Sequence, residues 1–259
     1  MAKLSVCAEC FFTDLPFAKR IEKIAKIGYR HIEFWHPEGT FNGRDIDFSQ
    51  PKNAAALKQA AADNGVTIND FAFSAWDGSI GGNPASQADH PKYWQQIQNM
   101  LDFARAAGCQ KGIVLSGLSQ PGLTPAKMLA NLRKAFTKAV ALAEKAGITL
   151  VLEPLNTLVD HAGYFLDGTA EAVNLIREIN SPNFKLLYDV YHMQIMQGNI
   201  LSFIEKNIDI IGHFHSAGVP GRAELFDTEV NYPAIIRKID ALGYTGCFGL
   251  EYFPKLDSA

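Results

Sequence analysis

Eight short apolar runs recur along the chain, and a segment with helical spacing of apolar residues follows nearly every one. The runs cover residues 4–9, 31–35, 66–73, 112–116, 148–153, 184–189, 208–215 and 247–251. Strands that alternate regularly with helices predict a parallel sheet in which the helices form the crossovers. Eight such units in 259 residues match the length of a closed (β/α)8 barrel. We therefore predict an α/β protein with a single TIM-barrel domain over residues 1–259.

The elements between the strands are predicted from apolar residues at helical spacing. The predicted helices are residues 15–27, 51–64, 92–107, 125–146, 169–179, 201–206 and 232–242, and residues 255–259 are expected to form a frayed tail. Asp14 precedes the first helix as an N-cap, and Gly147 ends the longest one. The competing fold, a doubly wound open sheet, usually has a glycine-rich phosphate fingerprint after its first strand. Residues 8–13 contain no such fingerprint, which favours the barrel.

The connections between elements are of two kinds. Long, polar connections follow the second, third, fifth and seventh predicted strands, whereas short glycine turns lead from the helices back to the next strand. In a parallel barrel every connection that follows a strand lies on the C-terminal face, where the active sites of this fold are built. We therefore expect the functional site at that face.

Composition excludes several classes of protein. A net charge of −3 gives no basic surface for nucleic acid, and no apolar run reaches the roughly 20 residues of a membrane span. The first residues lack the pattern of a secretory signal. We therefore expect a cytoplasmic protein with a small-molecule substrate and with no nucleic-acid or membrane partner. The four cysteines lack the spacing of a zinc site and are expected to be buried free thiols, namely Cys7, Cys10, Cys109 and Cys247.

Each of the last four predicted strands ends on a residue that can bind a metal ion: Glu153, Asp189, His215 and Glu251. Burial of an unpaired carboxylate costs several kcal/mol, and three carboxylates in one pocket would also repel one another. A divalent cation relieves this repulsion. Three hard oxygen ligands and one imidazole suit Mn²⁺ or Mg²⁺, with Co²⁺ or Zn²⁺ as alternatives. We therefore predict one divalent metal ion bound by these four residues.

The two glutamates of this set predict the type of reaction. Glu153 and Glu251 belong to the fifth and eighth predicted strands, which we expect on opposite sides of the ring, facing each other across its mouth. Two carboxylates around a metal-bound carbonyl suit proton transfer at the adjacent carbon, because one removes the proton and the other returns it. We predict that Glu153 and Glu251 are the catalytic pair.

Two residues close to the predicted ligands are candidates for substrate binding. His192, in the turn after Asp189, could donate to a substrate oxygen or could instead support Asp189. Arg222 lies in a Gly-Pro-Gly loop, where its planar guanidinium suits a carboxylate or a sugar oxygen, although a surface position is the alternative.

Three further side chains are expected near the barrel mouth. Trp35 and Trp76 end strand-like runs and fit an apolar pocket wall and packing at the rim equally well. His213 lies on the same face of its strand as His215. Since His215 is nearer the strand end, we expect His213 to be a hydrogen-bonded interior residue.

At these residues the sequence resembles the xylose-isomerase-like TIM-barrel family of sugar isomerases and epimerases, and within it the hydroxypyruvate isomerases. The resemblance covers nearly the whole chain and is densest in the second half. The motifs that carry it are Leu152-Glu-Pro-Leu-Asn156, Gly163-Tyr-Phe-Leu166, Tyr188-Asp-Val-Tyr-His-Met-Gln-Ile-Met196, Ala217-Gly-Val-Pro-Gly-Arg222, Asn231-Tyr-Pro233 and Gly249-Leu-Glu251. It implies a metal ion at the four positions named above, two glutamates that act as acid and base, and substrate contacts from His192 and Arg222.

The resemblance also implies a function. We expect a metal-dependent isomerase that converts a small hydroxy-ketone acid to a hydroxy-aldehyde acid, of the hydroxypyruvate to tartronate semialdehyde type, through an enediolate. Many hydroxypyruvate isomerases have glutamine where His215 stands, and histidine is usual there in ketose 3-epimerases. Ketose 3-epimerisation of a free sugar is therefore the alternative, and a sugar-binding barrel without turnover is the non-enzymatic one. Family members also suggest a homo-oligomer.

Overall fold

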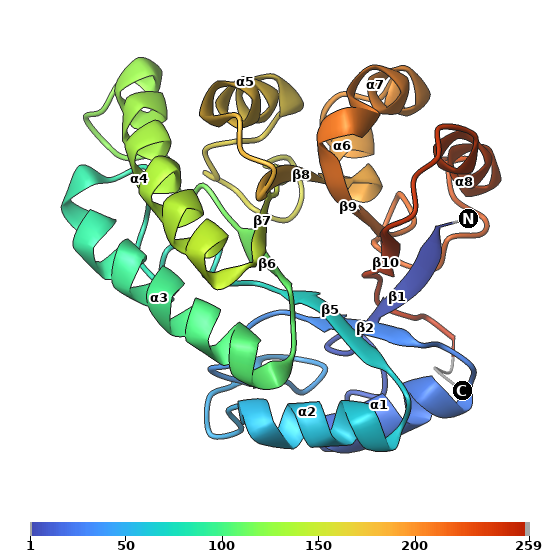
Figure 1. Ribbon diagram of the computed structural model, residues 1–259. Helices are drawn as coiled ribbons and strands as arrows, with labels where there is room; N and C mark the ends of the chain where they lie inside the picture. Colours follow the sequence, from blue (N-terminus) through green and yellow to red (C-terminus); the bar gives the residue numbers. More distant parts are fainter. Residues whose placement is uncertain (1, 257–259) are drawn as a thin grey trace.

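The computed structural model of the protein describes residues 2–256, so the end of the predicted tail, residues 257–259, lies outside the described range. Eight strands form one all-parallel sheet, and Figure 1 shows helices packed around its outside. These strands are β1 (Lys3–Cys7), β2 (His31–Phe34), β5 (Thr67–Phe71), β6 (Lys111–Val114), β7 (Thr149–Leu152), β8 (Phe184–Asp189), β9 (Ile211–Ser216) and β10 (Cys247–Leu250). Within residues 2–256 no helix has the length and apolar character needed to cross a membrane.

The sheet closes almost completely into a ring, as the sequence predicts. Its strand order is β5-β2-β1-β10-β9-β8-β7-β6. The two end strands meet through a parallel bridge between Ala72 and Ile113, and the Phe73 amide donates to the Ile113 carbonyl at 2.9 Å. We call this junction of β5 and β6 the seam. The predicted TIM barrel is therefore confirmed, with the seam as its least hydrogen-bonded joint among the described strands.

Eight α-helices lie within residues 2–256, but their distribution differs from the prediction. They are α1 (Phe17–Lys26), α2 (Ala54–Asp63), α3 (His90–Ala107), α4 (Pro125–Ala146), α5 (Thr169–Ile179), α6 (Val190–Met196), α7 (Ile200–Asn207) and α8 (Tyr232–Ala241). Two of them, α6 and α7, connect β8 to β9, and α6 was not predicted. The predicted N-cap Asp14 is wrong: Pro16 occupies the cap position of α1 and makes no side-chain cap. Gly147 ends α4 as predicted, in the left-handed conformation that costs glycine little.

Two irregular pairings set which strand residues lie side by side at the barrel mouth. Between β8 and β9 the register shifts after Leu186, so that Asp189 pairs with His215. Between β2 and β5 it shifts after Ile32, so that Glu33 pairs with Asp70. Neighbouring residues in paired parallel strands point to the same face, so each shift brings two polar side chains together inside the ring.

A short hairpin and a buried ionic cluster cover one side of the mouth. The hairpin strands β3 (Thr40–Phe41) and β4 (Ile46–Asp47) form in the long connection after β2, which was predicted only as a loop. Glu9 binds Lys52 at 2.5 Å, and its other oxygen accepts the Phe41 amide at 2.9 Å. The Arg20 guanidinium donates to the Phe41 carbonyl at 2.6 Å. This cluster therefore attaches the hairpin to the ends of β1 and β2. The four cysteines are buried and free, as expected.

Candidate functional site

A cavity of about 340 Å³ opens at the C-terminal ends of the strands, where the long connections predicted it. Each of the four long connections contributes a lining side chain: Phe48 after β2, Trp76 after β5, His161 after β7 and Arg222 after β9. The volume suits a small metabolite rather than a polymer.

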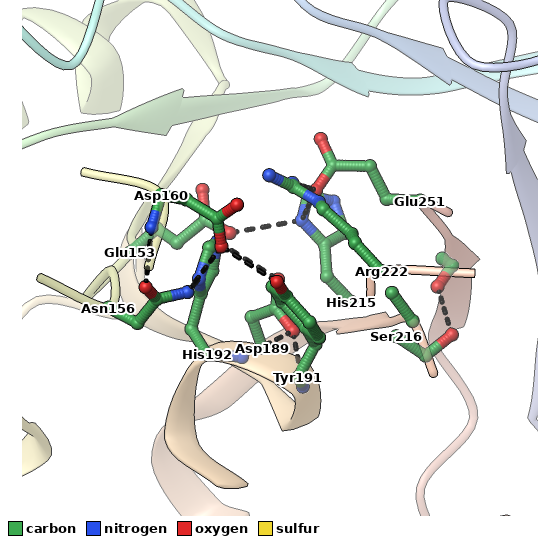
Figure 2. Close-up of polar contacts among 12 residues, drawn as sticks. Glu153, Asn156, Asp160, Asp189, Tyr191, His192, His215, Ser216, Arg222 and Glu251 are labelled. Carbon is green, nitrogen blue, oxygen red and sulfur yellow. Dashed lines mark hydrogen bonds and ion pairs between the residues drawn. The ribbon is translucent and has the colours of Figure 1, made fainter. Parts of the chain in front are cut away.

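The structure brings the four predicted metal ligands together, and three of them, Glu153, His215 and Glu251, line this cavity. Glu153 and Glu251 directly follow β7 and β10, Asp189 ends β8, and His215 lies near the end of β9. One ligand atom from each lies within 4.8 Å of the others, and all four side chains are buried. His215 Nδ1 lies 3.1 Å from Glu153 Oε1 and 3.5 Å from Glu251 Oε2 (Figure 2).

The relative position of the two glutamates differs from the prediction. They were expected on opposite sides of the ring, but only β8 and β9 separate β7 from β10 in the strand order. Glu153 and Glu251 therefore approach each other over His215, on one side of the mouth rather than across its full width. Near the seam, the cavity is lined by the apolar side chains of Ala72, Ile113 and Leu115.

Buried hydroxyl groups fix the backbone next to the candidate ligands. The Tyr164 hydroxyl donates to the Glu153 carbonyl and accepts from the Ser116 amide, both at 2.8 Å. The Tyr232 hydroxyl makes the same kind of pair with the carbonyl and amide of Ala217, two residues after His215. Tyr164 and Tyr232 belong to motifs that the sequence analysis quoted without assigning them a role. Each hydroxyl group joins the backbone next to a candidate ligand to a second element.

The electrostatics of the cluster reflect its burial and its excess of carboxylates. Burial, with Glu153 nearby, raises the pKa of Asp189 to about 7. Burial also raises the pKa of Glu153. For Glu251 burial acts in the same direction, but the attraction of His215 and Arg222 outweighs it and lowers the pKa. Burial opposes protonation of His215, yet Glu251, Glu153 and Glu33 outweigh it and raise its pKa well above the ordinary value.

These residues fit a divalent cation. Three buried carboxylates are accompanied by one permanent cation, Arg222, whose Nη2 lies 2.7 Å from Glu251 Oε2. Hard oxygens and a single imidazole nitrogen form a donor set for Mn²⁺, Mg²⁺ or Co²⁺. The raised pKa values of Asp189 and His215 mean that these side chains hold their protons more tightly than usual. A cation bound among them would replace those protons.

His192 lies beside Asp189, with its Nε2 3.5 Å from Asp189 Oδ2. The Asn156 amide lies 2.7 Å from His192 Nδ1, and Asn156 Oδ1 accepts the amides of Val159 and Asp160 (Figure 2). Because the oxygen of Asn156 is used by those amides, its NH₂ must face His192, which leaves the proton of a neutral ring on Nε2. That atom has no hydrogen-bond partner among the described residues, and the ring lines the cavity. Burial and then Arg222 keep the pKa of His192 well below its ordinary value.

The remaining predicted residues also line the cavity. Trp35 Nε1 donates to Glu251 Oε1 at 2.7 Å, and Trp76 packs edge-to-face against His161. Of the two alternatives for these tryptophans, the pocket wall is therefore the one observed. Arg222 is not a surface residue: it is paired with Glu251, and its buried Nε has no hydrogen-bond partner within residues 2–256.

A second buried cluster was missed by the sequence analysis. It consists of Glu33, Asp70 and His213, with His215 shared between the two clusters. His213 is an interior residue, as expected, and its Nε2 lies 3.1 Å from Glu33 Oε2 and 3.2 Å from Asp70 Oδ2. Glu33 and Asp70 lie inside strands rather than at strand ends. The only signal for them was a charged residue within each of two apolar runs.

His161 was also missed as a site residue. It follows β7 by several residues and lies in a loop whose path the sequence does not specify. Its ring contacts both Trp76 and His192 edge-to-face. Burial, followed by Arg222, lowers the pKa of His161 to about 4. It is therefore neutral near pH 7 and adds no charge to the cavity.

Comparisons with known proteins agree with the barrel fold. The family model described as "Xylose isomerase-like TIM barrel" matches residues 21–259. The chain is 29% identical to the hydroxypyruvate isomerase of Escherichia coli (strain K12), covering 98% of this chain and 95% of that protein. It is 30% identical to the 2-oxo-tetronate isomerase of Cupriavidus necator, covering 98% and 94%. A crystal structure titled AP endonuclease, family 2, from Brucella melitensis superimposes with a TM-score of 0.88 at 27% identity, covering 100% and 95%.

Proposed function

Because this chain belongs to the xylose isomerase-like TIM barrel family and is an isomerase like its curated relatives, we propose that it interconverts a small 2-keto-3-hydroxy acid and its 2-hydroxy-3-oxo isomer. Hydroxypyruvate is the first candidate substrate and 2-oxo-tetronate the second, since two relatives are named for these compounds. A cavity of about 340 Å³ accommodates either one together with a metal ion.

The proposed reaction moves one proton between adjacent carbons. One glutamate of the pair Glu153 and Glu251 removes the proton from the hydroxyl-bearing carbon, and the electrons of that C–H bond form an enediolate. The other glutamate returns a proton to the former carbonyl carbon, while the hydroxyl proton passes to the former carbonyl oxygen. The proximity of both carboxylates to His215 supports this pairing, because it places them around one small volume.

Glu153, Asp189, His215 and Glu251 would hold the divalent cation that the donor set fits. When bound, it would supply charge stabilisation for the developing enediolate. Arg222 keeps Glu251 ionised through its 2.7 Å contact, and its free Nε can donate to the substrate carboxylate. The Nε2–H of His192 is available to a substrate oxygen, and Trp35 and Trp76 limit the access of water.

The single observation that carries the proposal is the convergence of three buried carboxylates and one imidazole within 4.8 Å. The experiment compares Glu153→Gln, Glu251→Gln and the exposed control Glu171→Gln for conversion of hydroxypyruvate with Mn²⁺ and with chelator. Loss of an acid or base typically lowers the rate by about 10²–10⁴-fold, so each site variant should fall by at least about 100-fold. The control should retain its rate, and chelator should abolish wild-type turnover. Full activity in either site variant would contradict the paired assignment.

The identity of residue 215 also supports a second candidate function, ketose 3-epimerisation. His215 stands where histidine is usual in ketose 3-epimerases, and the same two glutamates could remove and return a proton on opposite faces of one carbon. The two reactions differ in their products, since isomerisation moves the carbonyl and epimerisation inverts one centre. NMR analysis of products from hydroxypyruvate, 2-oxo-tetronate and a free ketose separates them.

A further inference from the structure

His215 lies between two sets of carboxylates, one at each ring nitrogen. Its Nδ1 faces Glu153 and Glu251 in the candidate metal site, whereas its Nε2 lies 3.2 Å from Glu33 Oε1 in the second cluster. The side chains of His215 and Glu33 are 3% and 2% exposed, so water does not compete for this contact. The two nitrogens of one ring therefore have separate tasks.

We propose that Glu33 is a positioning residue of the metal site, because its carboxylate holds the proton on His215 Nε2 and thereby presents the lone pair of Nδ1 to the metal ion. This inference rests on the metal site of the proposed function. A carboxylate that accepts the second N–H of a metal-binding histidine fixes its tautomer and ring orientation and increases its basicity. Glu33 Oε1 is the described carboxylate oxygen that faces His215 Nε2: the two atoms form an ion pair at 3.2 Å, and neither has a hydrogen-bond partner within residues 2–256.

Glu33 is itself held in place by the second cluster. His213 Nε2 lies 3.1 Å from Glu33 Oε2. The Asn69 amide group donates to Asp70, and its carbonyl oxygen accepts from Lys111. The amide nitrogen of Asn69 therefore lies toward His213 Nδ1, at 3.4 Å, which places a proton on His213 Nε2 for donation to Glu33. A chain of contacts thus runs from Asn69 through His213 and Glu33 to His215.

The backbone makes room for this chain at Gly249. This residue pairs with His215 across β9 and β10. A Cβ atom at position 249 would lie 2.3 Å from Glu33 Oε1 and 2.7 Å from His215 Cδ2. Both distances are far below van der Waals contact, so any side chain there would separate Glu33 from His215. Glycine at this position is what permits the contact.

A second metal ion bound directly by Glu33, Asp70 and His213 is the competing explanation of the same cluster. The spacing of the ligand atoms would allow it. However, the Asn69 amide nitrogen faces His213 Nδ1, so the proton of the neutral ring is on Nε2, between the two carboxylates where a cation would bind. The two explanations differ in stoichiometry: one Mn²⁺ per chain for a positioning role, and two for a second site.

The test measures Mn²⁺ affinity and stoichiometry by calorimetry for the wild type, Glu33→Gln, Glu33→Asp, Gly249→Ala and the control Asp70→Asn. Loss of such an outer partner typically costs 10- to 100-fold in metal affinity, and we expect a loss of about this size in the Glu33 and Gly249 variants. Glu33→Asp keeps the charge but shortens the reach, and Gly249→Ala keeps all charges. Asp70→Asn removes a charge from the same cluster but leaves the contact between Glu33 and His215 in place. The loss of Mn²⁺ affinity in this variant should therefore be clearly smaller. Thermal unfolding checks that each variant is folded.

A second measurement uses only the wild-type protein. In the Mg²⁺-loaded form, long-range ¹H–¹⁵N NMR should show His215 protonated at Nε2 and unprotonated at Nδ1. If the wild type binds no divalent metal, the proposed function fails. If it binds one ion but Glu33→Asp and Gly249→Ala bind it equally well, or Nε2 carries no proton, the positioning role is overturned while the metal site stands. Two ions per wild-type chain would likewise overturn it.

Discussion

The hydrogen bonds of a single amide, Asn156, decide which nitrogen of His192 carries a proton. Its oxygen accepts two backbone amides, and its nitrogen faces both Asp160 Oδ2 and His192 Nδ1. Tyr191 donates to the same Asp160 oxygen at 2.8 Å and so limits how that carboxylate can move. His192 is therefore set as a neutral donor before any substrate arrives.

Replacement of Asn156 by aspartate should reverse this arrangement. A carboxylate beside Nδ1 favours the protonated ring, so the pKa of His192 should rise from its lowered value. The altered donor should reduce kcat/KM by about tenfold, the worth of one hydrogen bond. Proton NMR titration of His192 and steady-state kinetics measure the two effects. Asn183→Asp, whose amide donates to the Ile148 carbonyl away from the cavity, is the matched control. An unchanged His192 pKa would contradict this tautomer assignment.

The site residues that could be predicted lie at the ends of strands, whereas those that were missed lie in a loop or inside a strand. Glu153, Asp189, His215 and Glu251 end apolar runs, and a strand end in a barrel has a known location. Asn156 and His161 lie in a loop whose path depends on tertiary contacts. Glu33 and Asp70 meet only because of a shifted pairing, which no local sequence pattern specifies. The candidate metal ligands could thus be predicted, whereas the residues that support them could not.

At the scale of the elements, the hairpin β3–β4 depends on the buried cluster beneath it. Lys52 has a side chain that is only 1% exposed, and besides Glu9 it donates to the carbonyls of His36 and Gly39. Ile46 of the hairpin and Phe48 beyond it line the cavity. The ionic contact therefore supports one wall of the candidate site.

Lys52→Met should destabilise the protein strongly. It leaves Glu9 buried with Arg20 as its remaining cation, at 3.8 Å, and the loss of one partner of a buried pair costs about 3–5 kcal/mol. The control is Lys26→Met, because Lys26 pairs with Glu22 on the surface with 66% of its side chain exposed, and such pairs contribute about 0–1 kcal/mol. Chemical denaturation measures both. Equal stability of the two variants would show that the buried cluster does not hold the hairpin.

The elements themselves were largely predictable because alternation of strands and helices is a property of the sequence. The eight strands and most helices lie close to their predicted bounds. The missed helix α6 begins immediately after β8, with the Asp189 carboxylate accepting the Tyr191 and His192 amides. A residue expected to act only as a metal ligand is therefore also a helix cap, and a helix of this length has little periodicity to detect.

At the scale of the whole molecule, metal binding and stability are linked. A ligand that binds only the folded state adds about 2.7 kcal/mol at 100 times its Kd. For a domain of this size, 1 kcal/mol corresponds to about 2–4 °C in Tm. Saturation with Mn²⁺ should therefore raise the Tm of the wild type by about 5–10 °C, and chelator should reverse the change. Differential scanning calorimetry measures it, and Glu251→Gln should show a much smaller shift. A wild-type Tm that is insensitive to Mn²⁺ would argue against the metal site.

The position of the seam divides the cavity into two halves with different freedom to change. In the strand order the seam lies diametrically opposite the junction of β9 and β10, which provides His215 and precedes Glu251. Side chains on the seam side, such as Ala72, Trp76 and Ile113, shape the space without holding the charged cluster. Selection for a longer or shorter substrate can therefore act on that half while the reactive half is inherited intact, which is how one scaffold can give rise to isomerases of different specificity.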